Sequence, residues 1–117
     1  MTVTDVADIG RVVARIVAEE VESEDRVLCV AGHTVSYGQL VDVVEMVSGC
    51  KAKRVEWSVL YLQRELEKDL EDGIEKYRRV FARDGVWWDM ERTVNYQLGM
   101  EMMDVKTYAK TVFCGRE

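Results

Sequence analysis

Four stretches of the chain place apolar residues at intervals of three and four, which is the spacing of one face of an α-helix. These sets are Val6, Ile9, Val13, Ile16 and Val17; Leu40, Val43, Val44 and Val47; Leu62, Leu66, Leu70, Ile74, Tyr77 and Phe81; and Val105, Tyr108, Ala109 and Val112. The 117 residues include no proline, which suits helices because an internal proline breaks them. The sequence therefore predicts a chain built mainly from amphipathic helices.

Polar residues and glycines at the ends of these stretches set the expected boundaries. Thr4 or Asp5 can cap the free amides of the first helix. Ser36 and Gln39 form a capping-box pattern at the start of the second helix, and Gly49 ends it. The expected helices cover residues 5–20, 36–49, 58–84 with a break at the glycine in 72–73, 89–98, and a last segment from about 104.

Two short apolar segments are predicted to be strands. Residues 26–31 have the pattern of a strand buried on both faces, and residues 53–57 alternate enough to form a second one. The helix between them favours a right-handed parallel pair, which needs cover from helices or from another chain. The predicted fold class is therefore α+β and helix-rich, with a small two-stranded β-α-β element packed with about five helices in one domain, residues 1–117.

The charge and hydropathy of the chain exclude several classes of partner. The formal charge of −6 argues against nucleic acid, because nucleic-acid binding depends on clustered Lys and Arg. No apolar run approaches the roughly 18 residues of a membrane-spanning helix, and residues 1–5 lack a signal-peptide pattern. We expect a cytoplasmic protein with no nucleic-acid partner and no membrane partner.

The sequence also lacks the common cofactor and metal motifs. Cys29, Cys50 and Cys114 lie far apart and His33 is the only histidine, so neither zinc nor a disulfide framework is predicted. There is no glycine-rich phosphate loop after a strand and no Tyr-x-x-x-Lys pair. We therefore expect no cofactor, neither NAD nor NADP, and no self-sufficient reductase.

Four segments stand in a distinctive order and spacing. They are residues 4–16 (TDVADIGRVVARI), residues 26–32 (RVLCVAG), residues 34–40 (TVSYGQL) and residues 85–91 (GVWWDME). Together they resemble the C-terminal part of the NmrA-like and isoflavone-reductase-like proteins, which are atypical short-chain dehydrogenases. The resemblance implies a substrate lobe that closes over a ligand, separate from the Rossmann half that binds NADP. The glycine-rich loop and catalytic lysine of the family lie in that other half and have no counterpart here.

Three residues are candidates for acid–base chemistry. His33 follows the glycine after the first predicted strand, and an imidazole can exchange a proton near neutral pH. Asp89 follows two tryptophans, so an apolar wall could keep it protonated as a general acid. Tyr37 could orient or protonate a polar atom of a ligand. The alternatives are a histidine in a turn that faces water and an ordinary helix cap at Asp89.

Large apolar side chains could form an adaptable pocket for a small aromatic or terpenoid molecule. The candidates are Trp57, Trp87, Trp88, Met100, Met102 and Met103. The alternative is that these residues build a core or a subunit interface.

Two functional hypotheses follow from these observations. The first is a stand-alone small-molecule-binding protein, or a cofactor-independent isomerase or cyclase of secondary-metabolite biosynthesis, derived from a substrate lobe. The second is a regulatory or interaction module without catalysis, or a fragment of an NADP-dependent reductase. We expect an apolar ligand, and either a homodimer or pairing with a cofactor-bearing protein, because the surface that would cover a Rossmann domain is otherwise exposed.

Overall fold

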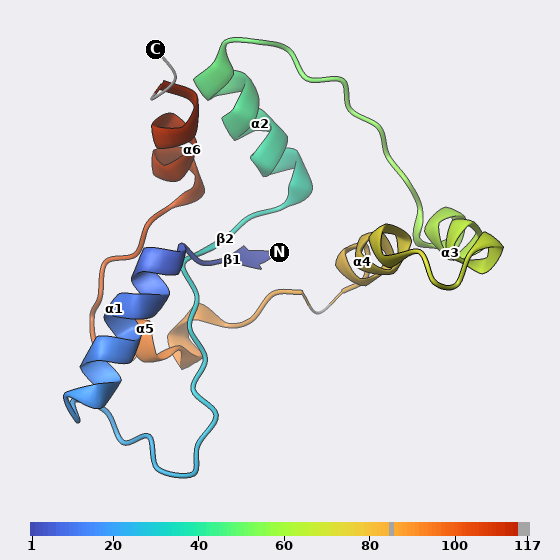
Figure 1. Cartoon of the computed structure of the whole chain (residues 1–117). Helices are drawn as coiled ribbons and strands as arrows, with labels where there is room; N and C mark the ends of the chain where they lie inside the picture. Colours follow the sequence, from blue (N-terminus) through green and yellow to red (C-terminus); the bar gives the residue numbers. More distant parts are fainter. Residues whose placement is uncertain (85, 115–117) are drawn as a thin grey trace.

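The computed structural model describes residues 1–84 and 86–114 and is α+β and helix-rich, as the sequence predicts (Figure 1). Within these residues the elements are β1 (Thr2–Val3), α1 (Val6–Val17), β2 (His33–Thr34), α2 (Tyr37–Ser48), α3 (Val59–Lys68), α4 (Gly73–Phe81), the 3-10 helix η1 (Met90–Arg92), α5 (Val94–Gln97) and α6 (Val105–Cys114). The predicted fold class is therefore confirmed.

The sheet differs from the predicted parallel pair in both position and direction. β1 and β2 pair antiparallel, with Val3 opposite His33. In the part of the chain that the structure describes, neither residues 26–31 nor residues 53–57 form a strand. A two-stranded sheet with one helix between its strands is present, but the predicted location of its strands and their parallel direction are wrong.

Backbone groups in residues 26–31 find partners other than a neighbouring strand. The carbonyl of Cys29 accepts a hydrogen bond from the Val94 amide at 2.9 Å. The Asn95 side chain pairs with both the N–H and the C=O of Ala31. Because a helix start and a side chain satisfy these groups, the segment needs no strand beside it. An apolar run in the sequence cannot distinguish these two kinds of partner.

Several predicted helix ends are confirmed. At the start of α2 the Ser36 side chain accepts from the Gln39 amide at 3.1 Å, and the Gln39 side chain accepts from the Ser36 amide at 2.9 Å. Gly49 ends α2 in the left-handed conformation, with a φ of 69°. Asp72 caps α4, so the predicted break at 72–73 separates α3 from α4.

The single helix predicted over residues 89–98 is two short ones. Thr93 lies between η1 and α5 with extended backbone and is fully buried. Its hydroxyl donates to the Met90 carbonyl at 2.6 Å and accepts from the Tyr96 amide at 3.3 Å. One side chain therefore ends the first turn and caps the next helix, which helical spacing alone does not reveal.

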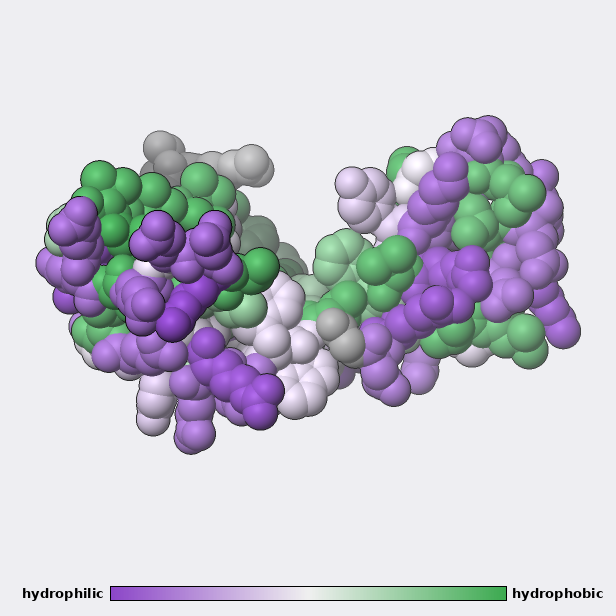
Figure 2. All heavy atoms as spheres, turned by 90° about the horizontal axis from the view of Figure 1, so that it is seen from below, coloured by the Kyte–Doolittle hydropathy of each residue, from purple (hydrophilic) through white to green (hydrophobic). Residues whose placement is uncertain are grey.

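The buried apolar core is small and the chain is spread out. Within the described residues the core consists of Val12, Ala31, Val35, Leu62, Leu66, Val94 and Ala109. α2 packs on α6, and α3 packs on α4 to form an arm, residues 59–81 (Figure 1). The arm stands away from the other helices (Figure 2). The radius of gyration is 17.4 Å, whereas a compact chain of this length has about 13 Å.

Apolar faces of two helices remain uncovered. On α1, Val6 is 80% exposed and Val17 is 76% exposed, and both lie on the stripe whose spacing predicted the helix. On the arm, Ile74 and Tyr77 of α4 are exposed in the same way. Monomers rarely leave such patches open to water. These faces are suited to burial against another domain or another chain.

Candidate ligand pocket

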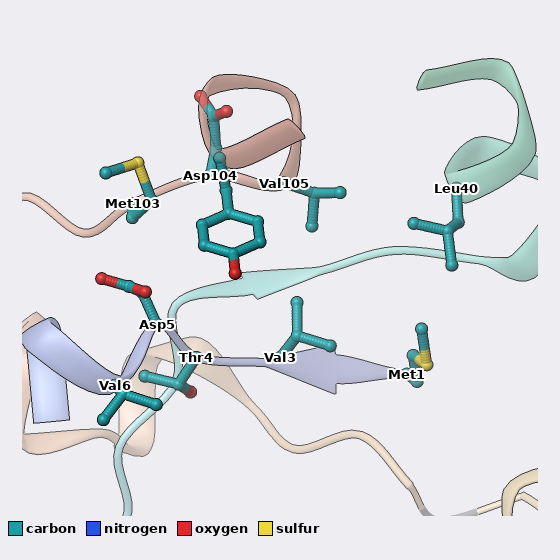
Figure 3. Close-up of a pocket in the computed structure, with 10 residues that line it drawn as sticks. Met1, Val3, Thr4, Asp5, Val6, Leu40, Met103, Asp104 and Val105 are labelled. Atoms are coloured by element: carbon teal, nitrogen blue, oxygen red, sulfur yellow. The ribbon is translucent and has the colours of Figure 1, made fainter. Parts of the chain in front are cut away.

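A pocket of about 340 Å³ lies where β1 and the start of α1 meet α2 and the start of α6 (Figure 3). It is lined by Met1, Val3, Thr4, Asp5, Val6, Leu40, Met103, Asp104, Val105 and Tyr108. Met1 and Leu40 stand at one end, and Asp5 and Met103 stand at the other. Its size is at the lower end of the range for small-molecule sites. Most of the lining is apolar, and its carboxylates are those of Asp5 and Asp104.

Pairing of β1 with β2 brings the start of α6 to this pocket. At the end of the β1–β2 pair the N-terminal ammonium group of Met1 donates to the Val35 carbonyl at 2.7 Å, and the Val35 amide donates to the Met1 carbonyl at 2.9 Å. On β2, the Nδ1 atom of His33 accepts a hydrogen bond from the Val105 amide at 3.2 Å. The imidazole thereby holds the first turn of α6 against the sheet.

Two carboxylates belong to the pocket lining, and they differ in their partners. Asp104 precedes α6 and accepts a hydrogen bond from the Thr107 amide at 2.6 Å. Hydrogen bonds from Thr107 lower the pKa of Asp104 below its usual value, so Asp104 is a carboxylate at neutral pH. Asp5 precedes α1 but makes no side-chain cap bond. The carboxylate of Asp5 can therefore still accept a hydrogen bond from a ligand, whereas Asp104 already accepts one from its own helix.

A buried carboxylate on α1 fixes the segment that carries Met103. Asp8 is buried, and its Oδ2 atom accepts from the Met103 amide at 2.6 Å. Its Oδ1 atom pairs with the Arg11 guanidinium at 2.8 Å, and Arg11 also donates to the Glu101 carbonyl at 3.1 Å. α1 therefore positions the pocket wall before α6 through one charged side chain.

Replacing Asp8 with alanine should lower the free energy of unfolding by about 2 kcal/mol, because the half-buried Met103 amide would lose its partner. Asp42→Ala is the matched control, since Asp42 is exposed and pairs with exposed Arg54 at 2.6 Å. Such surface pairs contribute less than about 1 kcal/mol. Urea denaturation followed by circular dichroism would measure both, and equal losses would contradict the role given to Asp8.

The three candidate acid–base residues occupy separate places. His33 is half-buried and serves as the acceptor at the start of α6. Asp89 accepts from the Glu91 amide at 3.0 Å and so caps η1. The Tyr37 hydroxyl donates to the carbonyl of Phe81. None of these three residues belongs to the described lining of the pocket. Their catalytic role stays a prediction.

The candidate apolar ligand residues are also dispersed. Trp57 lies just before the arm, 6.1 Å from Tyr61 between ring centroids and under the guanidinium of Arg78. The Trp88 indole donates to the Val30 carbonyl at 3.1 Å, and Trp87 is 58% exposed. Met100 and Met102 are half-buried, and only Met103 of this set lines the pocket in the described structure. The structure does not gather the three tryptophans around this pocket.

Sequence reasoning did not identify most of the residues that line the pocket. The sequence analysis predicts no helix or strand at Met1 or Val3. Thr2, Val3 and Thr4 are nevertheless β-branched residues, which favour strands. Asp5 was expected only as a helix cap. The run of β-branched residues was the available signal for β1, but its partner lies 30 residues away.

In the ranges 1–84 and 86–114, no cluster of His, Cys, Asp and Glu is arranged to hold a metal ion. Over the same ranges, no helix is both long and apolar enough to cross a membrane. Cys29, Cys50 and Cys114 are exposed free thiols.

The fold and the pocket define a helix-rich α+β chain with a site of small-molecule size and uncovered apolar faces. The chain is similar to an NmrA-like family domain-containing oxidoreductase of Gibberella moniliformis, with 37% identity over 115 residues. No family model matches the chain. No solved structure matches it.

The similarity covers the two proteins unequally. It includes 96% of this chain and 37% of the relative, so the chain spans little more than a third of the curated relative that it matches. The predicted resemblance is therefore confirmed as a match to part of an NmrA-like protein. The assignment to a C-terminal lobe stays a prediction.

Proposed function

We propose that this chain is the substrate-binding lobe of an NmrA-like oxidoreductase, and that it contributes a pocket wall while a separate nucleotide-binding domain supplies the redox chemistry. The observation that carries the proposal is the similarity to an NmrA-like oxidoreductase along 96% of this chain. The family resemblance implies that NADP binds to the other domain. The substrate is a small, largely apolar molecule.

The uncovered apolar faces support a docking partner. The exposed stripes of α1 and α4 would lose their contact with water against a second domain, and apolar burial contributes about 25 cal/mol per Å². The radius of gyration of 17.4 Å fits a lobe that is completed by another body. The larger part of the relative lies outside the match and could supply that body.

The pocket is suited to binding and orientation rather than to proton donation. Its lining is mainly apolar, and the hydrogen bonds from Thr107 keep Asp104 ionised at neutral pH. An ionised carboxylate can accept a hydrogen bond or a proton but cannot act as a general acid. A cofactor-free isomerase would have to use a hydroxyl of the lining, such as that of Tyr108, as its proton donor. We favour the lobe of an oxidoreductase because of the similarity to the Gibberella protein.

A chimera tests this proposal directly. The matched third of the Gibberella oxidoreductase would be replaced by this chain, with the intact relative and a deletion of the matched third as controls. We expect the chimera to be monodisperse, to melt cooperatively and to bind NADPH about as tightly as the relative, because the chain restores the missing lobe. Light scattering, thermal denaturation and nucleotide fluorescence would measure these properties.

The contrary results are specific. A chimera that aggregates while the intact relative folds would show that the two interfaces do not match. A deletion control that binds NADPH and turns over substrate as well as the intact relative would show that the lobe has no role. A stable homodimer of this chain that does not dissociate in the presence of the deletion protein would favour a self-contained module instead.

A further inference from the structure

We infer that the pocket between β1 and α6 takes a ligand that joins an apolar body to a protonated amine. This inference rests on the proposed small-molecule function and names the chemical class of its ligand. Val3, Leu40 and Val105 give the pocket its apolar surface. The charged side chains of the described lining are Asp5 and Asp104, and both are acidic. The positive α-ammonium group of Met1 lies at the end away from Asp5 and donates to the Val35 carbonyl at 2.7 Å. A cation with an apolar body is complementary to this arrangement.

The arrangement of the lining fits the two ends of such a molecule. Met1 and Leu40 lie at one end of the pocket, and Asp5 lies at the other (Figure 3). An aromatic or aliphatic body would lie against the apolar end. An ammonium group would then reach the Asp5 end. A hydrogen bond from the ammonium group to the Asp5 carboxylate would join two opposite charges, and it would be stronger than a hydrogen bond from a neutral donor.

The helix ends at this pocket do not reverse the charge preference. α1 and α6 both begin here, and each helix N-terminus carries about half a positive charge. At the Asp5 end of the pocket the full negative charges of Asp5 and Asp104 exceed these partial charges, because the Met1 ammonium group lies at the opposite end. The first turn of α6 is also occupied, because its Val105 amide donates to His33 and its Thr107 amide donates to Asp104. An anion would find few free donors on α6.

Asp5 is the residue best placed to act as the counter-ion. In the described structure its carboxylate makes no cap bond to α1 and takes part in no ion pair. In Asp104, by contrast, one carboxylate oxygen already accepts a hydrogen bond from the Thr107 amide at 2.6 Å. Asp5 should therefore make the direct contact, while Asp104 contributes mainly negative potential.

Three probes with one skeleton separate charge from shape. Phenethylamine, 2-phenylethanol and phenylacetate would be titrated into the full chain, with the methyl groups of Val3, Leu40 and Val105 observed by NMR. We expect all three methyl groups to shift with the amine. The amine should bind about tenfold more tightly than the alcohol, because only the amine adds the attraction between two opposite full charges to the hydrogen bond. The carboxylate should bind most weakly.

Variants locate the counter-ion. Asp5→Asn should remove most of the preference for the amine over the alcohol. Because Asp5 makes no side-chain cap bond, the substitution removes no hydrogen bond from α1. Asp104→Asn should reduce the preference by a smaller factor. Asp72→Asn is the matched control, because Asp72 also precedes a helix but lies on the arm. The Asp72→Asn variant should prefer the amine over the alcohol as strongly as the unchanged chain does.

Each contrary result has a definite meaning. Equal affinity for amine and alcohol would overturn the inference while leaving the pocket as a small-molecule site. Tighter binding of phenylacetate, or an unchanged preference in Asp5→Asn, would overturn the charge assignment. An absence of methyl shifts with all three probes would also overturn it. The chimera experiment uses none of these probes, so failure of the proposed function would be recognised separately by loss of folding or nucleotide binding.

Discussion

Replacement of Asn95 by alanine should lower the free energy of unfolding by about 3 kcal/mol. Asn95 is buried, and its side chain accepts from the Ala31 amide at 3.1 Å and donates to the Ala31 carbonyl at 2.8 Å. Ala31 is itself fully buried, so the substitution leaves two backbone groups without partners and without water. Each such group costs about 1–3 kcal/mol. This is a large share of the 5–15 kcal/mol typical of a domain.

Gln97→Ala provides the control for Asn95→Ala. Gln97 lies on the same short helix, α5, but is exposed, so its loss should change stability by less than about 0.5 kcal/mol. Urea denaturation of both variants would compare them with the unchanged chain. Asn95→Asp keeps the acceptor for the Ala31 amide but sets an oxygen against the Ala31 carbonyl, so it should not rescue stability. A loss below about 1 kcal/mol in Asn95→Ala would contradict this account.

Gly32→Ala should also be strongly destabilising, by about 1–3 kcal/mol. A Cβ atom on Gly32 would lie 2.8 Å from the Val3 carbonyl oxygen, 3.2 Å from the Thr4 Cα atom and 3.4 Å from the Met103 carbonyl oxygen. All three are backbone atoms, so β1 or the segment before α6 must move. The movement would also weaken the bond of 3.2 Å from the Gly32 amide to the Val3 carbonyl.

Gly10→Ala should have the opposite sign. Gly10 lies in the middle of α1, and a Cβ atom there would meet no atom within 4 Å. Alanine favours a helix over glycine by about 1 kcal/mol, so this variant should be more stable than the unchanged chain. Thermal denaturation of the two variants gives the comparison. Equal melting temperatures for Gly10→Ala and Gly32→Ala would show that β1 does not pack closely on Gly32.

The helices and their ends were the most predictable features. The capping box of Ser36 and Gln39, the left-handed Gly49 and the break at 72–73 follow from residues within one or two turns of each other. These signals are local, because a cap depends on amides three residues away. The same holds for α6, whose start at Asp104 was predicted from the sequence.

The pocket was much less predictable. Asp5 and Asp104 are 99 positions apart and become neighbours of one pocket only when β1 pairs with β2 and His33 anchors α6. Trp57, Trp87 and Trp88 were expected together because they are the large apolar side chains. In the structure Trp57 lies beside Tyr61 of the arm. The Trp88 indole donates a hydrogen bond to the Val30 carbonyl. Residue type indicated which side chains could form a pocket but not which would meet.

The sequence by itself determined the helix-rich class, most helix boundaries and the apolar stripes of α1 and α4, because these depend on spacing and capping within a few residues. Only the tertiary structure decided that residues 26–31 bond to Asn95 and the start of α5, that β1 pairs with β2, and that the stripes remain uncovered. Those outcomes depend on contacts between residues far apart in the chain. The local spacing of apolar residues does not predict which distant residue bonds to a backbone group or covers an apolar face.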